Sequence, residues 1–89
     1  MAKKRRKLNK DFEKKIYSSK KNVELVLAKI FDIDDEDIQK EYVPAFNEVG
    51  YLYDQLNEDY ETEGFNDKSD ELLKNYKVAL NLFESEFEI

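Results

Sequence analysis

Apolar residues near the start of the chain recur at the spacing of an amphipathic helix. Leu8, Phe12 and Ile16 follow one another every four residues, which places their side chains on one helical face. This pattern predicts a first helix that begins within residues 8 to 11 and runs to Tyr17.

A second apolar run follows two serines. Ser18 and Ser19 interrupt the first run, and either hydroxyl can cap a new helix. The apolar residues of this second helix step by three and four positions: Val23, Val26, Leu27 and Ile30. A strand over "VELVL" is the competing prediction because the stretch is short and partly β-branched, but the neighbouring Ala28 and Lys29 favour a helix.

The middle of the chain carries the longest apolar stripe. Its acidic start, "DIDDED", is typical of a helix N-terminus, where carboxylates interact favourably with the macrodipole. The stripe then steps by four and three residues: Ile38, Tyr42, Ala45, Val49, Leu52 and Leu56. The continuous register predicts one helix across Pro44. An interior proline removes a hydrogen bond and clashes with the carbonyl of Lys40, so we expect a kink or a break there.

The segment "ETEGFNDKS" predicts a loop, and a last helix follows from about Ser69. The apolar residues of this helix are Leu72, Leu73, Tyr76, Ala79, Leu80, Phe83 and Phe87. With no convincing strand, the chain is predicted to be all-α, a small bundle of three to four helices. We expect residues 1 to 8 to form a disordered basic arm and residues 9 to 89 to form one acidic helical domain.

Charge is divided unevenly along the chain. The 89 residues carry a formal net charge of -6, yet residues 1 to 21 carry +8 and residues 22 to 89 carry -14. The arm contributes an unbroken cationic run: Lys3, Lys4, Arg5, Arg6 and Lys7. Two interpretations are open. The arm is either a solvated terminus, free to lie against the acidic body, or a contact for nucleic acid or an acidic partner.

The composition argues against catalysis. Because the chain has no His and no Cys, and only four Ser and one Thr, nucleophile–base triads, zinc sites and imidazole proton transfer lack their residues. We therefore expect no enzymatic activity and no cofactor. No apolar run is long enough to span a membrane, and none follows the basic start, so we expect neither a membrane segment nor a signal peptide.

Residues 59 to 70, "DYETEGFNDKSD", match part of a calcium-binding EF-hand loop. The matching positions are Asp59, Glu61, Glu63, Gly64, Asp67 and Asp70. The two glutamates are longer than the usual ligands, and Asp70 replaces the bidentate glutamate. An ordinary acidic loop is therefore favoured over weak calcium binding, and no metal ligand is predicted.

Carboxylates along the middle helix form a second pattern. On a wheel of 100° per residue, Asp37, Glu41, Glu48 and Asp59 fall within about 40° of one line, a quarter turn from the apolar stripe, and Tyr51 borders them. Their gaps correspond to about 6, 10 and 16 Å along the axis, and the first two overlap the scale of phosphate spacing along a strand.

A solvated helix face is the simpler interpretation of these carboxylates. In composition, however, the chain resembles small acidic helical proteins that imitate DNA, several of them encoded by phages. The resemblance implies that the acidic face occupies the nucleic-acid-binding surface of a basic partner protein and blocks it.

Two other binding functions remain open. The arm can tether an acidic effector to DNA or RNA. Alternatively, the apolar stripe can serve an interaction or assembly module, of the antitoxin, immunity or adaptor type, or join two copies in a homodimer. Charge-led association weakens with salt whereas apolar association tolerates it, which separates these functions. The lack of cysteine suits the cytoplasm, that of the host if the protein is phage-encoded.

Overall fold

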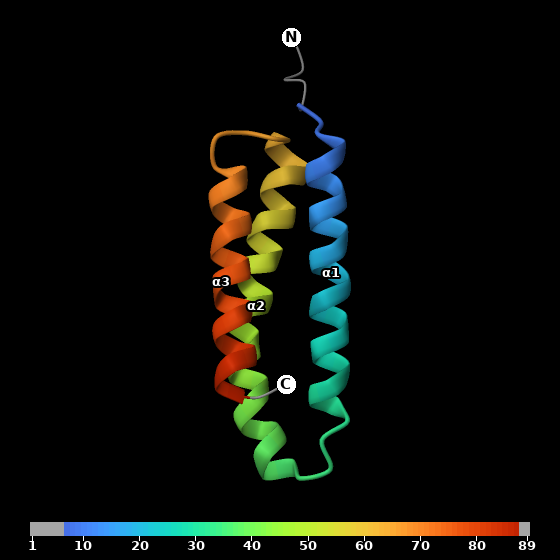
Figure 1. Ribbon diagram of the computed structural model, residues 1–89, viewed down its shortest axis with the longest axis vertical. Helices are drawn as coiled ribbons and strands as arrows, with labels where there is room; N and C mark the ends of the chain where they lie inside the picture. Colours follow the sequence, from blue (N-terminus) through green and yellow to red (C-terminus); the bar gives the residue numbers. More distant parts are fainter. Residues whose placement is uncertain (1–6, 88–89) are drawn as a thin grey trace.

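The computed structural model describes residues 7 to 87 and contains three α-helices (Figure 1). They are α1 (Lys10–Phe31), α2 (Glu36–Glu63) and α3 (Ser69–Phe87). The all-α prediction is therefore confirmed, with three helices rather than four. The body is elongated, with extents of 55 × 23 × 17 Å, because its helices lie side by side along one axis.

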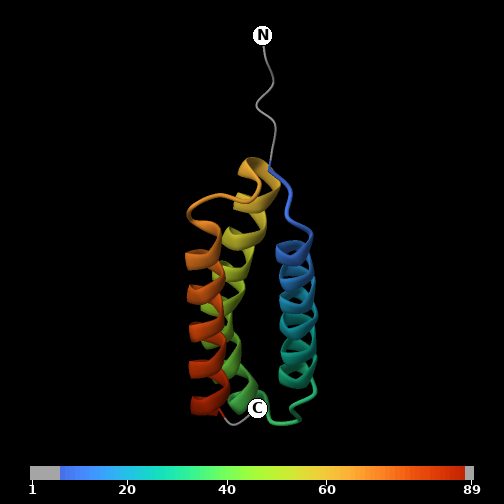
Figure 2. The same cartoon turned by 45° about the horizontal axis from the view of Figure 1, so that its top comes forward.

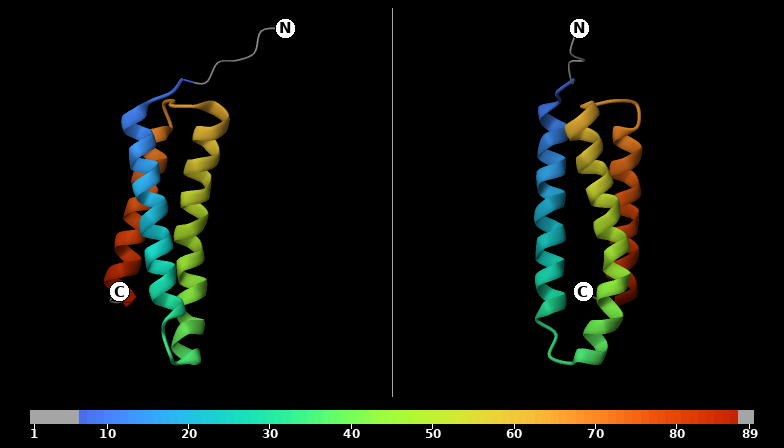
Figure 3. Two further views of the ribbon diagram at one scale, coloured as in Figure 1. Left: turned by 90° about the vertical axis from the view of Figure 1, so that its right-hand side faces the viewer. Right: turned by 180° about the vertical axis from the view of Figure 1, so that it is seen from behind.

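Successive helices run in opposite directions, so that α1 and α3 are parallel (Figures 2 and 3). The central element is α2, which packs along both neighbours, whereas α1 and α3 touch at few points. Among the helices of the described region, none is long and apolar enough to cross a membrane. The two interfaces of α2, with α1 and with α3, are therefore closely packed. We call the side of the molecule where α1 and α3 face each other the open flank.

The first helix does not break at the two serines, so the prediction of separate helices is wrong. Ser19 is 3% exposed, and its hydroxyl donates to the carbonyl oxygen of Lys15 at 2.8 Å. A serine hydroxyl bonded to the preceding turn is satisfied inside a helix, so Ser19 does not need to end it. The helix starts where the side chain of Asn9 accepts from the amide of Phe12 at 3.0 Å.

The predicted start of α2 is confirmed. The Asp35 side chain accepts from the amides of Asp37 and Ile38, as an N-cap requires. Pro44 lies inside α2 without a break in the helix, and its ring is exposed. Of the expected kink or break, the break is therefore wrong, because packing of α2 on both sides outweighs the cost of one lost hydrogen bond.

The last turn of α2 also differs from the prediction. Residues 61 to 63 belong to the helix rather than to a loop, and the helix ends at Gly64, where φ is 73° and ψ is -162°. The amide of Gly64 donates to the carbonyl oxygen of Tyr60 at 2.9 Å. The loop is therefore only residues 64 to 68, followed by α3 at the predicted Ser69.

The core lies between the three helices and consists of the following buried side chains: Phe12, Ile16, Val26, Ile30, Phe46, Val49, Leu56, Tyr60, Leu73, Tyr76, Leu80 and Phe83. Of the predicted α2 stripe, Val49 and Leu56 are fully buried, while Ile38 is 42% exposed. Ile38 lies one turn before Tyr42, whose ring packs against Phe87 in the last turn of α3. It is exposed because α3 ends there.

The N-terminal end of the body is closed by contacts between distant segments. The carbonyl oxygen of Lys7 accepts from the amide of Phe65 at 2.6 Å, and the amide of Asn9 donates to the Tyr60 hydroxyl at 3.0 Å. The rings of Tyr60 and Phe65 lie 5.5 and 5.1 Å from that of Phe12. Lys7, a residue of the predicted arm, therefore contacts the end of the helical domain.

Candidate partner-binding surface

All five predicted partner-binding residues lie on α2. Asp37, Glu41 and Glu48 are exposed, and Tyr51 is 62% exposed. They share a flank of the helix because their spacing in sequence is close to whole turns of 3.6 residues. We call Asp37, Glu41, Glu48, Tyr51 and Asp59 the carboxylate surface.

Asp59 is the least accessible member of the carboxylate surface. It is half-buried, and its Oδ2 accepts from the side-chain Nδ2 of Asn66 at 2.8 Å. The same amide nitrogen donates to the carbonyl oxygen of Gly64 at 2.9 Å, and the Asn66 Oδ1 accepts from the amide of Lys68 at 2.8 Å. Asp59 therefore stabilises the loop between α2 and α3, and Asp37, Glu41 and Glu48 are the carboxylates best placed to meet a partner.

Tyr51 is oriented by its own helix. Its hydroxyl accepts from the side-chain amide of Gln55 at 2.9 Å, one turn further along α2. Because this hydrogen bond favours one orientation of an exposed ring, Tyr51 offers both an apolar ring face and a polar tip beside Glu48.

A shallow groove lies next to Glu48, between α2 and α3. It has a volume of about 220 Å³, and its lining is mostly apolar, with one further carboxylate from α3: Ala45, Glu48, Val49, Ala79, Leu82, Phe83, Glu86 and Phe87. Leu82 is 64% exposed. Leu82 and Glu86 were not among the predicted site residues, since both lie off the apolar face of α3 and only the pairing of α2 with α3 brings them beside Glu48.

The first helix is opposite in charge to the central one. α2 contains nine carboxylates against one lysine, whereas α1 contains six lysines against three carboxylates. A partner that meets the α2 flank therefore encounters a largely anionic surface, and one that meets α1 encounters a largely cationic one.

The EF-hand interpretation fails on geometry. Asp59, Glu61 and Glu63, which would hold the first, third and fifth ligand positions, lie in the last turns of α2 rather than in a loop. Within residues 7 to 87, no group of three or more metal-ligating side chains is arranged to hold an ion.

Of the five cationic residues predicted for the arm, only Lys7 lies in the described part of the chain, where its backbone pairs with Gly64 and Phe65 at one end of the body. Lys3, Lys4, Arg5 and Arg6 lie outside the described residues. The arm therefore joins the body where α1 begins and α2 ends.

The apolar stripe of α2 is largely used within the chain. Val49 and Leu56 belong to the core, and Tyr42, Ala45 and Leu52 pack against it. A partner or second copy that needs Val49 or Leu56 would have to displace α1 or α3.

Comparisons of this chain with protein-family models, with curated proteins and with solved structures find no match.

Proposed function

We propose that the protein is a non-enzymatic binding protein whose carboxylate surface occupies the nucleic-acid-binding surface of a basic partner, as an inhibitor or regulator of the DNA-mimic type. The observation that carries this proposal is the line of exposed carboxylates Asp37, Glu41 and Glu48 on the most acidic helix. The lack of cysteine supports a reducing compartment such as the cytoplasm.

The rigidity of α2 favours this function over loose charge attraction. The helix packs along both α1 and α3, so the backbone beneath the carboxylates is fixed before a partner arrives. A preorganised surface loses less conformational entropy on binding than a flexible acidic tail does. Rigid spacing of negative charge is also what a groove built for phosphates can recognise.

The groove beside Glu48 adds a contact that charge alone does not provide. Leu82 is exposed there and lines the groove together with Glu48 and Glu86. Apolar contact of this kind supplies affinity, while the surrounding charges supply association rate and orientation. The footprint we propose therefore crosses from α2 to α3.

The test is affinity capture from lysates with the full chain at low and high salt, followed by binding measurements with the basic protein that is retained. Reversing Asp37, Glu41 and Glu48 to Lys together should reduce affinity at least tenfold more than reversing Glu24, Asp34 and Asp54 to Lys. All six residues are exposed, and the two variants change net charge equally, so the comparison isolates position from bulk charge. Binding of the unchanged protein should weaken as salt rises, since exposed charges are screened over about 10 Å at 0.1 M.

Equal losses in the two triple variants would show that bulk charge, not the carboxylate surface, drives association. A partner that keeps nucleic acid at its own nucleic-acid-binding surface while it holds this protein would contradict mimicry. Competition between a labelled duplex and the protein for the captured partner distinguishes these results.

A further inference from the structure

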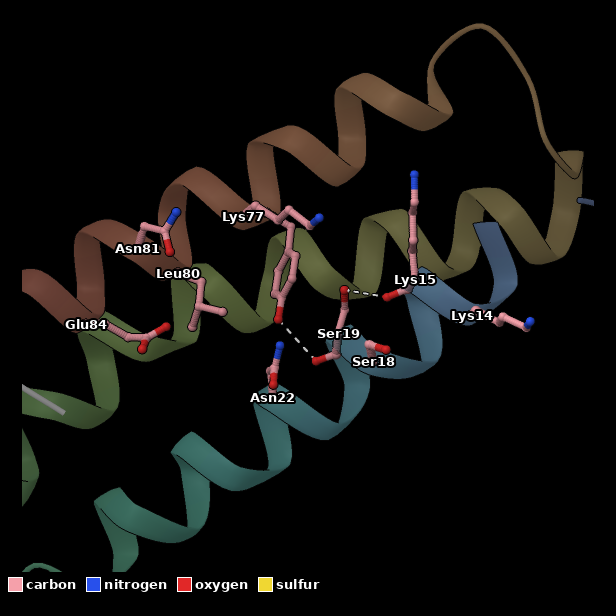
Figure 4. A pocket seen from close by; sticks show the side chains of 10 residues that line it. Lys14, Lys15, Ser18, Ser19, Asn22, Lys77, Leu80, Asn81 and Glu84 are labelled. Carbon is pink, nitrogen blue, oxygen red and sulfur yellow. Dashed lines mark hydrogen bonds between the residues drawn. The ribbon is translucent and has the colours of Figure 1, made fainter. Parts of the chain in front are cut away.

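A groove of about 480 Å³ runs along the open flank between α1 and α3. Figure 4 shows side chains of the two helices on opposite sides of it. The lining is polar and rich in cationic and amide groups: Lys14, Lys15, Ser18, Ser19, Asn22, Tyr76, Lys77, Leu80, Asn81 and Glu84. No side chain of α2 is among them, so the anionic helix does not face this groove.

The groove exists because small and polar side chains occupy the α1 side. Ser18 and Asn22 are exposed there, and Ser19 is buried at the base. At that base the Tyr76 hydroxyl donates to the carbonyl oxygen of Ser19 at 3.1 Å. This contact ties α3 to α1 deep in the molecule, and the lining around it is mostly polar, with Leu80 as its aliphatic side chain. The helices α1 and α3 are therefore in contact at the base of the groove and separated at the molecular surface.

The groove carries an excess of positive charge. Lys14 and Lys15 approach from α1 and Lys77 from α3, against a single carboxylate, Glu84. All three lysines are exposed. Lys10 lies one turn before Lys14 on the same face of α1, so the cationic surface continues toward the end of the body where the arm joins.

We propose that this groove binds the phosphodiester backbone of single-stranded nucleic acid. Lysine ammonium groups neutralise phosphates, and the amides of Asn22 and Asn81 and the hydroxyl of Ser18 are donors of the kind that contact phosphate oxygens. A nucleic acid is favoured over an acidic protein because the three lysines lie beside amide and hydroxyl donors, and because the sequence that precedes α1, Lys3 to Lys7, is typical of phosphate contact.

A single strand is favoured over a duplex by the shape of the site. The groove lies between two neighbouring helices, each about 10 to 12 Å across with its side chains, and a duplex is too wide to enter it. No exposed aromatic ring lines the groove, because Tyr76 is buried. Without a ring for base stacking, binding depends on phosphates, and it is therefore independent of base sequence and sensitive to salt.

This inference does not depend on the carboxylate surface, because the two sites share no residue. Together they describe a protein that meets a nucleic-acid-binding partner through α2 and a nucleic acid strand through α1 and α3. Failure of one site leaves the other testable, since the first is measured with a captured protein and the second with an oligonucleotide alone.

The experiment is fluorescence anisotropy of the full chain with a labelled oligothymidylate long enough to span the 55 Å body. The groove variant K14Q/K15Q/K77Q should bind at least tenfold more weakly than the wild type. The matched variant K20Q/K40Q/K68Q removes the same charge from exposed lysines outside the groove. Its loss in the logarithm of the affinity should be less than half that of the groove variant. The variant E84Q should bind more tightly, because it removes the only carboxylate of the lining.

Salt dependence provides a second readout. Each phosphate contact to a single strand contributes about 0.7 to the slope of log affinity against log salt, so losing three contacts should lower the slope by about 2. The arm is present in every variant and contributes equally to each. Circular dichroism should show equal helix content in all variants, because each replaced side chain in the two triple variants is exposed.

Three results would overturn the proposal. They are an absence of oligothymidylate binding by the wild-type chain at low salt, equal losses in the two lysine variants, and tighter binding of a duplex or of polyglutamate than of the single strand. The second result would mean that the net charge of the protein, not the groove, determines binding. The third would assign the cationic surface to a different ligand.

Discussion

The hydroxyl of Tyr76 donates to the backbone carbonyl oxygen of Ser19 across 3.1 Å, and both residues are buried although 57 positions separate them in sequence. This hydrogen bond joins α3 to α1, the two helices that otherwise touch at few points. It also forms the base of the groove between them. The stability of the open flank should therefore depend on Tyr76 more than on the exposed side chains around it.

Replacement of Tyr76 by Phe tests this contact. The ring is retained and the hydrogen bond is lost, so the free energy of unfolding should fall by about 0.5 to 1.5 kcal/mol. Urea denaturation followed by circular dichroism measures the change. Tyr51→Phe is the control. Because the Tyr51 ring is exposed, this substitution should leave the free energy of unfolding within about 0.5 kcal/mol of the wild type. Equal effects would show that the buried hydrogen bond contributes nothing.

Stability should decline in alkaline solution. Burial raises the pKa of Tyr76 above its ordinary value of 10.0, and burial, followed by the nearby carboxylate of Asp54, raises that of Tyr53. The folded protein then keeps protons that the unfolded chain releases, so the free energy of unfolding is greatest below about pH 10 and falls as pH rises through that value. Urea midpoints from about pH 9 to about pH 11 should fall less steeply for Y53F/Y76F than for the wild type; parallel slopes would contradict this assignment.

Pro44 is a site where substitution should stabilise the protein. It lies inside a continuous helix and is exposed, so Pro44→Ala restores an amide that can donate to the carbonyl of Lys40 without removing core packing. The free energy of unfolding should rise by about 2 kcal/mol. This is less than the full cost of proline inside a helix, roughly 3 kcal/mol, because alanine also gives the unfolded chain more conformational freedom. Thermal unfolding measures it. A loss of stability would mean that the proline sets a bend that the core requires.

Gly50 is a second stabilising site. It lies in α2, and apart from its chain neighbours and the backbone of its own helix, no heavy atom would lie within 4 Å of an added Cβ atom. Gly50→Ala should therefore raise the free energy of unfolding by about 1 kcal/mol through helix propensity alone. A decrease would indicate that the backbone around Gly50 does not stay helical.

The same substitution at Gly64 should have the opposite sign. With φ at 73° and ψ at -162°, Gly64 occupies a backbone region that is essentially restricted to glycine. Gly64→Ala should destabilise the protein by about 1 to 3 kcal/mol. Comparison with Gly50→Ala by urea denaturation separates backbone conformation from helix propensity, and equal signs would contradict the described end of α2.

Phe12 should be the most sensitive aromatic residue at the N-terminal end. Its ring is 2% exposed and contacts those of Tyr60 and Phe65, so Phe12→Ala should cost about 3 to 5 kcal/mol. Leu25→Ala on the exposed side of α1 is the control, with an expected change of less than about 0.5 kcal/mol. The cost at Phe12 is a large part of the stability of a domain this size, so denaturation should be measured at low temperature.

Periodicity determined much of the fold without tertiary information. The steps of three and four residues predicted the helical class, the start of α2 at its acidic cap and the start of α3 at Ser69, because these features depend on side chains close together in sequence. The same local geometry places Asp37, Glu41 and Glu48 on one exposed flank, as predicted.

Contacts between distant segments decided the remaining features. Ser19 stays inside α1 because its hydroxyl bonds to Lys15 and its position faces the core. Asp59 is drawn toward the loop by Asn66, and Leu82 and Glu86 join Glu48 only because α2 and α3 pair. The groove at Lys14 and Lys77 arises because α1 and α3 both pack on α2 more closely than on each other. Local sequence determines which face a side chain occupies, but the packing of whole helices determines which faces meet.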